Sequence, residues 1–197
     1  MNQQLLDILL ALKQSDSDTR SRLLQAGQLY GIYNEEMQQV HRENALQLDR
    51  IISKHDWPGL ALVGLEGCRA AWLIAQHSNC TPALQRKFLA VMRSAAERND
   101  VPAKQIAFLT DRIRFNENKP QVYGTILDWD ETGELSCVVD DAENLDSRRI
   151  EVGLSPYQVE LEQHINEVKA EGGVCPGNIR AYKQQGRDWA RSVGWLD

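Results

Sequence analysis

The sequence predicts a mainly helical α+β protein with one antiparallel β-hairpin packed on a helical core. Two observations predict it. Apolar residues recur at helical spacing through most of the first 115 positions. After Pro120 the period changes to the alternation of a strand, and the turn at residues 130–133 brings a second such segment back. Helices near residues 60–78, 82–98 and 102–115 are expected to pack against this hairpin.

Composition limits both the domain organisation and the function classes. A chain of 197 residues with 42% hydrophobic and 25% charged residues fits one globular unit. We divide it into amino-terminal helices (1–56), a core domain (57–156) and a carboxy-terminal helix with an aromatic tail (157–197). The net charge of -6 argues against nucleic-acid binding. No apolar run is long enough for a membrane span, and no signal peptide is evident, so we expect a cytoplasmic protein.

The first 25 residues are expected to form a helical hairpin. Leu5, Ile8, Leu9 and Leu12 lie at helical spacing. The polar run at residues 15–18 then reads as the end of one helix and the N-cap of the next.

The second helical region carries three polar side chains of interest. Its apolar stripe ends before Trp57-Pro58-Gly59, because proline disfavours helix in the preceding residue. Asn44 falls on the stripe and is either an inward-pointing amide or a surface one. His41 and His55 stand among charged neighbours, so we expect both to be solvated.

The helix near residues 60–78 is apolar on nearly all sides from Cys68 to Ala75 and is expected at the centre of the core. His77 shares a stripe with Ala70 and Ile74 and would project from the buried face at the helix end. A histidine there is suited to act as a general acid or base. A C-cap that binds backbone carbonyls explains the same residue.

Asp111 lies between apolar positions of the third core helix, so its carboxylate needs a partner. Arg112, Arg114 or His77 could supply one, and a structural ion pair explains Asp111 and Arg112 as well as catalysis does. In the following strand, Gln121 and Tyr123 place an amide and a phenol on one face, where they could orient a substrate oxygen. Alternatively, these groups bond only to backbone.

Several short motifs in fixed order resemble a widespread bacterial family of domains of unknown function. The resemblance covers about residues 46–156 and implies the fold neighbourhood and site positions, but no reaction. The chain has Asp56 and Ile126 where glycine and glutamine are frequent in that pattern. The motifs are Trp57-Pro58, Gln76-His77-Ser78, Asp111-Arg112, Pro120-Gln121-Val122-Tyr123-Gly124-Thr125, the run from Asn144 through Asp146 to Arg148-Arg149, and Gly153-Leu154.

The last third is expected to fold back on itself. Acidic residues 140–143 are close in sequence to Arg148 and Arg149, which favours local ion pairs. A helix opens at Ser155-Pro156, and the tail after residue 173 contains a short helix with Trp189. Its aromatic residues favour docking over a free end.

Two functions remain open from the sequence. The first is a hydrolase or transferase for a small polar or anionic ligand, with His77 as general base and Asp111 orienting it. Gln76, Arg112, Gln121, Tyr123 and Thr125 would bind that ligand. The second is a non-enzymatic immunity or regulatory module, whose acidic surface or aromatic tail binds a protein partner. No metal-ligand motif, phosphate loop or dinucleotide fingerprint is present, so no cofactor or metal is expected.

Overall fold

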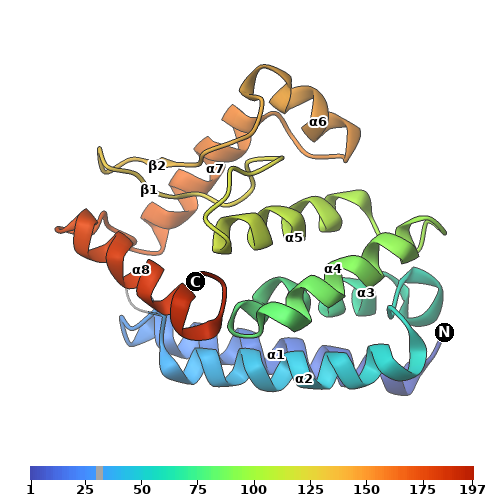
Figure 1. The fold of residues 1–197 in the computed structure, drawn as a ribbon. Helices are drawn as coiled ribbons and strands as arrows, with labels where there is room; N and C mark the ends of the chain where they lie inside the picture. Colours follow the sequence, from blue (N-terminus) through green and yellow to red (C-terminus); the bar gives the residue numbers. More distant parts are fainter. Residues whose placement is uncertain (30–32) are drawn as a thin grey trace. The chain divides into compact units, whose positions relative to one another are not determined.

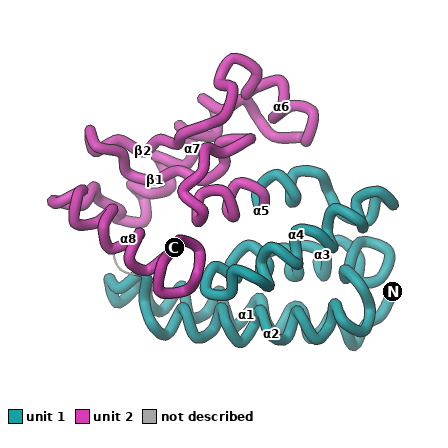
Figure 2. Tube along the Cα trace, viewed as in Figure 1, with its two compact units in different colours: residues 1–29, 33–109 teal, residues 30–32, 110–197 magenta. Residues whose placement is uncertain are grey.

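The structure is a computed structural model, and it describes residues 1–29 and 33–197. These residues contain eight α-helices and one two-stranded antiparallel sheet (Figure 1), which confirms the mainly helical α+β class. Contacts within the chain define two compact units (Figure 2). Unit 1 comprises residues 1–29 and 33–109, and residues 110–197 belong to unit 2.

Unit 1 is a helical bundle. Helix α1 packs along α3 and against α2, and α2 also packs on α3 and α4 (Figure 1). Helices α3, α4 and α5 match the predicted ranges closely, and α5 continues into unit 2. The bounds are α1 (Gln3–Gln25), α2 (Glu35–His55), α3 (Leu60–His77), the 3₁₀ turn η1 (Ser78–Cys80), α4 (Pro82–Ala96) and α5 (Ala103–Asn116).

Helix α1 is continuous, so the predicted break at residues 15–18 is wrong. Asn2 caps the helix, since its side chain accepts a hydrogen bond from the amide of Leu5. Gln14 donates to Asp18 one turn later on the exposed side. Asp16 instead points into the bundle and is only 3% exposed. Asp16 and Asp18 therefore interact with other side chains rather than with free backbone amides, and the helix continues through residues 15–18.

Helix α2 ends at His55 as predicted, but the prediction for His41 is wrong. His41 is buried, at 7% exposed, whereas His55 is exposed. Asn44 is also buried, and its side-chain amide donates to the carbonyl of Leu12 at 3.1 Å. Of the two interpretations of Asn44, the inward-pointing one is therefore correct. Its partner is the backbone of α1.

The Trp57-Pro58-Gly59 segment joins α2 to α3 and is fixed by Asp100. The backbone carbonyl of Asp100 accepts from the amide of Leu60 at 3.0 Å, and its carboxylate accepts from that of Ala61 at 2.6 Å. These bonds satisfy amides that are unpaired at any helix start. A Cβ on Gly59 would lie 2.5 Å from the carbonyl oxygen of Asp100. Glycine is thus required by close approach of backbone.

Unit 2 contains a shorter hairpin than predicted. Strand β1 (Asp128–Trp129) pairs with β2 (Leu135–Ser136) in antiparallel register, and the turn between them is present as expected. Residues 121–126 form a loop instead of the predicted strand. Gly124 has φ of +62°, which breaks the extended conformation. Gln121 forms an isolated bridge with Val139 in the parallel sense, so this end of the segment does not continue the hairpin ladder.

Three further helices complete unit 2. The helix predicted after Pro156 and the one predicted in the tail are confirmed as α7 and α8, and α8 is longer than expected. Trp195 at the end of the tail is buried. The helices are α6 (Leu145–Glu151), preceded by the 3₁₀ turn η2 (Ala142–Asn144), α7 (Tyr157–Ala170) and α8 (Ile179–Val193).

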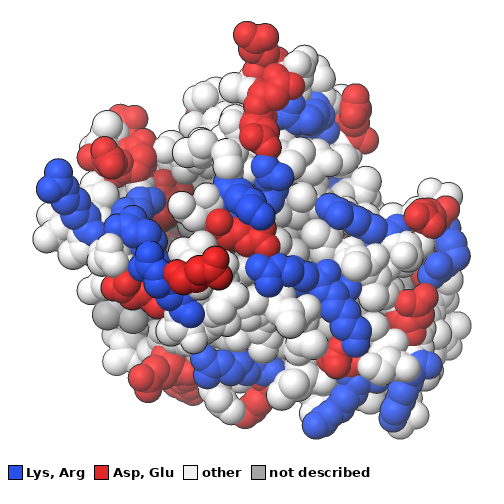
Figure 3. Space-filling model, viewed as in Figure 1, with Lys and Arg blue, Asp and Glu red and all other residues white. Residues whose placement is uncertain are grey.

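The surface charges and the helix lengths bear on two function classes that the composition argues against, nucleic-acid binding and membrane spanning. Acidic and basic side chains are interspersed on the face drawn in Figure 3. Within the part of the chain that the structure describes, no helix has both the length and the apolar character needed to cross a bilayer. The expectation that the protein binds no nucleic acid stays a prediction.

The contact between Gly59 and Asp100 predicts a specific loss of stability. Gly59→Ala should lower the free energy of unfolding by about 1–3 kcal/mol, since the new methyl group collides with backbone that cannot rotate away. Gly186→Ala in α8 is the matched control: its Cβ meets nothing within 4 Å, and alanine favours helix. Urea unfolding of both variants measures the difference. Equal stability of the two variants would contradict this packing.

Candidate functional site

Three titratable side chains from three helices of unit 1 meet in one cluster, Asp16–His41–His77. Oδ2 of Asp16 lies 2.7 Å from Nδ1 of His77 and 3.0 Å from Nε2 of His41. The two imidazole rings lie against each other, with centroids 4.9 Å apart. Asp16 comes from α1, His41 from α2 and His77 from the last residue of α3. The cluster therefore depends on the packing of these three helices.

The apolar stripes of the helices place Asp16 and His41 inside. Asp16 continues a stripe on α1 that begins with Leu5 and Leu9 and ends with Leu23, at spacings of three and four. His41 stands at the same spacing between Met37 and Ala45 on α2. Neither residue was predicted, because both stand among polar neighbours in the sequence that mask this periodicity. The spacing itself was the signal that could have identified them.

Side chains other than His77 bond to the last carbonyls of α3. The imidazole of His77 can therefore join the cluster. The side-chain amide of Gln85 donates to the carbonyls of Ala75 and Gln76, at 2.8 and 3.0 Å. The hydroxyl of Ser78 donates to the carbonyl of Ile74 at 2.7 Å. These bonds supply the C-cap that was one explanation of His77. Its imidazole instead bonds to a carboxylate on α1.

The electrostatics of Asp16 are set by its two imidazole neighbours. Burial by itself raises the pKa of a carboxyl group, because it penalises the charged form. Hydrogen bonds and positive charge from His41 and His77 outweigh burial and hold the pKa of Asp16 well below its usual value of 3.8. Asp16 is thus an anion at neutral pH, and its charge is compensated inside the bundle.

Hydrogen-bond roles in the cluster follow from the chemistry of the carboxylate. An ionised carboxylate only accepts hydrogen bonds, so Nδ1 of His77 carries a proton and donates a hydrogen bond to Asp16. In the neutral ring, Nε2 then has the free lone pair. The His77 side chain is 28% exposed, compared with 8% for His41 and 4% for Asp16. Only His77 among the three thus has substantial contact with solvent.

Tyr33 extends the cluster on the side of His41. Its phenol oxygen is hydrogen-bonded to Nδ1 of His41. In a neutral His41 whose Nε2 faces Asp16 with its proton, Nδ1 accepts this bond and the phenol donates. Nδ1 of His41 is therefore hydrogen-bonded, and Nε2 of the same ring lies 3.0 Å from the carboxylate of Asp16.

Gln76 precedes His77 and was expected to bind a ligand. It is buried at 5% exposed. Within the described residues, its side-chain oxygen has no hydrogen-bond partner. A buried acceptor without a partner is energetically costly.

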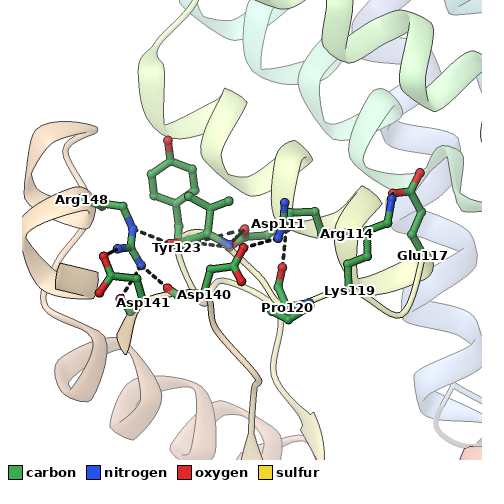
Figure 4. Close-up of polar contacts among 10 residues, drawn as sticks. Asp111, Arg114, Glu117, Lys119, Pro120, Tyr123, Asp140, Asp141 and Arg148 are labelled. Atoms are coloured by element: carbon green, nitrogen blue, oxygen red, sulfur yellow. Dashed lines mark hydrogen bonds and ion pairs between the residues drawn. The ribbon is translucent and has the colours of Figure 1, made fainter. Parts of the chain in front are cut away.

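Asp111 lies in unit 2 and holds the loop of residues 120–126. Its carboxylate accepts hydrogen bonds from the amides of Val122, Tyr123 and Thr125 at 2.8 to 3.2 Å, and from the hydroxyl of Thr125 at 3.1 Å. Figure 4 draws Asp111 with dashed lines from its carboxylate to the loop backbone. Burial raises the pKa of Asp111 above its usual value, although these bonds oppose the shift. Its neighbours supply dipoles rather than a positive charge, unlike those of Asp16.

Two arginines of α6 fasten the same loop from the other side. Arg148 donates to the carbonyl of Val122 at 3.0 Å and pairs with Asp141 (Figure 4), which agrees with the expected local ion pairs. Arg149 is fully buried, donates to the carbonyl of Tyr123 at 2.5 Å and pairs with Glu160. The arginines thus satisfy backbone carbonyls of the loop, as Asp111 satisfies its amides.

The other predicted ligand-binding residues have varied surroundings. The side-chain amide of Gln121 donates to the carbonyl of Ile126 at 2.7 Å and accepts from its backbone amide at 2.9 Å. This is the alternative in which Gln121 bonds only to backbone. The phenol of Tyr123 points away from the drawn contacts in Figure 4. Arg112 follows Asp111 on α5 and is half-buried. Arg114, two residues further along the helix, pairs with Asp140.

The structure therefore sorts the predicted site residues into two groups. His77 joins a cluster with Asp16 and His41, two residues not predicted, while Asp111, Gln121 and Thr125 join a loop-holding network of unit 2. The carboxylate that orients His77 is Asp16. Binding roles for Gln76, Arg112, Gln121, Tyr123 and Thr125 stay predictions.

Comparison with known proteins places the chain in a family. The fold and cluster define a helical protein with a buried carboxylate between two imidazoles. Residues 3–171 match the model of a family of unknown function (DUF6624), and the chain belongs to that family. The match confirms the expected membership in a family of uncharacterised domains and extends beyond residues 46–156. No curated protein and no solved structure matches the chain.

The low pKa of Asp16 predicts a pH-dependent contribution to stability. Because the folded pKa lies below 3.8, the stabilisation is fully present above about pH 4 and is lost as the pH falls through the folded value. Asp16→Asn should therefore cost about 3 kcal/mol near neutrality, with a smaller cost in acid. Urea unfolding of both proteins between pH 3 and 7, with a chelator present, measures the difference. A cost that does not change with pH would contradict it.

The role of Asp111 predicts local protection of the loop. In the wild type, the amides of Val122, Tyr123 and Thr125 should exchange slowly with solvent deuterium, because each donates to a buried carboxylate. Asp111→Ala should accelerate exchange at these amides at least tenfold more than at amides of α2. Asp146→Ala, which removes one bond to the amide of Tyr157, is the control and should leave residues 122–125 protected. Unchanged exchange in Asp111→Ala would refute the assignment.

Proposed function

We propose that this protein is a hydrolase for a small polar substrate, and that it activates water at the Asp16–His41–His77 cluster. The observation that carries the proposal is the 2.7 Å bond between Nδ1 of His77 and the buried carboxylate of Asp16. A half-buried imidazole oriented by a carboxylate is an arrangement suited to general-base catalysis. A transferase that activates a substrate hydroxyl would use the same base.

The proton transfers follow from this arrangement. Nε2 of His77 takes a proton from water as the water oxygen attacks the electrophilic carbon or phosphorus of the substrate. The imidazolium formed is stabilised by the charge of Asp16. It then returns the proton to the leaving group, so the base is regenerated. Asp16 stays ionised throughout because its pKa is held low.

Each member of the cluster has a distinct role in this proposal. His77 is the general base, and Asp16 is a positioning residue that fixes its tautomer. His41 is a second positioning residue, since its Nε2 contacts the same carboxylate oxygen at 3.0 Å. Tyr33 in turn orients His41. The proposal uses unit 1 alone, because Asp111 and Gln121 are engaged by the loop at residues 120–126.

A comparison of rates on a panel of chromogenic substrates tests the proposal. The panel contains carboxylic esters, phosphate monoesters and phosphate diesters, and kcat/KM is measured for wild type and variants. His77→Ala should lose about 10²- to 10⁴-fold on any hydrolysed substrate, as removal of a general base does. Asp16→Asn should lose a comparable factor with KM nearly unchanged, since it acts through His77.

His55→Ala is the matched control. His55 is an exposed histidine on α2, the helix that carries His41, and its removal should leave kcat/KM unchanged. If wild type hydrolyses no member of the panel faster than His77→Ala does, the proposal is wrong. That outcome would favour the alternative of a non-enzymatic binding module.

A further inference from the structure

We infer that Asp16, His41 and His77 form a binding site for one divalent transition-metal ion, with Zn²⁺ the ion of first choice. The three residues offer a carboxylate oxygen and two imidazole nitrogens, and these atoms all lie within 4.8 Å of one another. The sequence motifs gave no sign of such a site, because its ligands come from three helices far apart in the chain.

The spacing of the donor atoms suits coordination. Two ligands that each lie about 2.0–2.2 Å from a zinc ion are separated from each other by roughly 3–3.5 Å. Oδ2 of Asp16 already lies 2.7 Å from one imidazole nitrogen and 3.0 Å from the other. Small side-chain rotations therefore suffice to open the cluster around an ion, and the helices that carry the ligands need not separate.

The chemistry of the donor set selects the class of ion. Two imidazoles with one carboxylate suit zinc and other first-row divalent ions, whereas Ca²⁺ and Mg²⁺ prefer oxygen ligands alone. Three protein ligands leave further coordination positions open. His77 is 28% exposed on its side chain, so water or a substrate could reach those positions.

The negative charge of Asp16 also favours a divalent ion in the cluster. The Asp16 carboxylate is almost completely buried, and a buried anion requires a compensating positive charge. A divalent ion supplies that charge while both imidazoles remain neutral, which is the form in which histidine binds metal. The ion would take the place of the protons now shared between Asp16 and the two histidines.

Tyr33 already occupies the position of an outer-shell partner. A histidine that binds metal through one ring nitrogen typically donates the proton of its other nitrogen to a fixed acceptor. The phenol oxygen of Tyr33 is hydrogen-bonded to Nδ1 of His41, while Nε2 faces Asp16. With Nε2 bound to an ion, Nδ1 would carry the ring proton and donate to the phenol oxygen, the reverse of the direction in the ion-free cluster, and the ring would keep its orientation.

The consequence for catalysis rests on the proposed hydrolase function. With an ion bound, Nδ1 of His77 would be a ligand, and the ion would supply Lewis-acid activation of a water in an open coordination position. The proton of the neutral His77 ring would then lie on Nε2, so the role of general base given to His77 describes the ion-free cluster. Ion binding itself does not depend on that function.

Isothermal titration of ZnCl₂ into chelator-treated, full-length protein tests the site. The wild type should bind one ion per chain, and replacement with Co²⁺ should give the visible absorption of a site with nitrogen and oxygen ligands. His77→Ala and Asp16→Asn should each weaken binding at least 100-fold. Tyr33→Phe, which keeps all three ligands, should weaken it about 10- to 100-fold.

Two histidine variants outside the cluster are controls. His55→Ala removes an exposed histidine, and His164→Ala removes a half-buried one that lies 3.7 Å from Glu167. Both variants should leave the affinity unchanged. Circular dichroism shows which variants are folded, and the Co²⁺ spectrum of the wild type needs no variant at all. Absence of saturable binding by the wild type, or equal affinity in folded His77→Ala, overturns the inference.

Activity separates this inference from the proposed function. If chelator-treated protein binds no added Zn²⁺ yet hydrolyses a substrate that His77→Ala does not, the metal site is wrong and the hydrolase stands. If the ion binds as described and no substrate is turned over, the metal site stands and the hydrolase is wrong.

Discussion

The charge of Asp16 is the constraint on which the candidate site depends. A carboxylate at 3% exposure loses its hydration, and that loss is tolerable only where positive or donating groups replace it. Here both replacements are imidazoles, one from α2 and one from α3. The same requirement that keeps three helices in register therefore also assembles three groups able to bind protons or a metal ion.

The two buried aspartates show how similar residues acquire different roles. Asp16 faces groups that can become cationic, so its pKa falls despite burial. Asp111 faces backbone amides and a hydroxyl, which stabilise a charge less completely, so burial dominates and its pKa rises. The first environment is suited to moving a proton through a neighbour. The second is suited to holding a loop in one conformation, with arginines bonded to the loop's carbonyls.

Local patterns predicted α3, α4 and α5 well because the ends of these helices are marked in the sequence. Pro82 and the Trp57-Pro58-Gly59 segment give bounds close to those observed. The hairpin was predicted too long because residues 121–126 alternate like a strand, whereas Gly124 at positive φ and the bonds to Asp111 make them a loop. Those bonds join positions more than ten residues apart. Alternation within the segment carries no information about them.

The site was only partly predictable for a related reason. His77 was identified because its helix is apolar on nearly all sides from Cys68 to Ala75, so a polar residue on the buried face stands out. Asp16 and His41 lie on helices with many charged residues, where composition hides two inward-facing groups among solvated ones. Their positions in the apolar stripes identify them as buried. Since buried charges are rare unless paired, stripe position combined with charge is the stronger criterion for a site than the polarity of sequence neighbours.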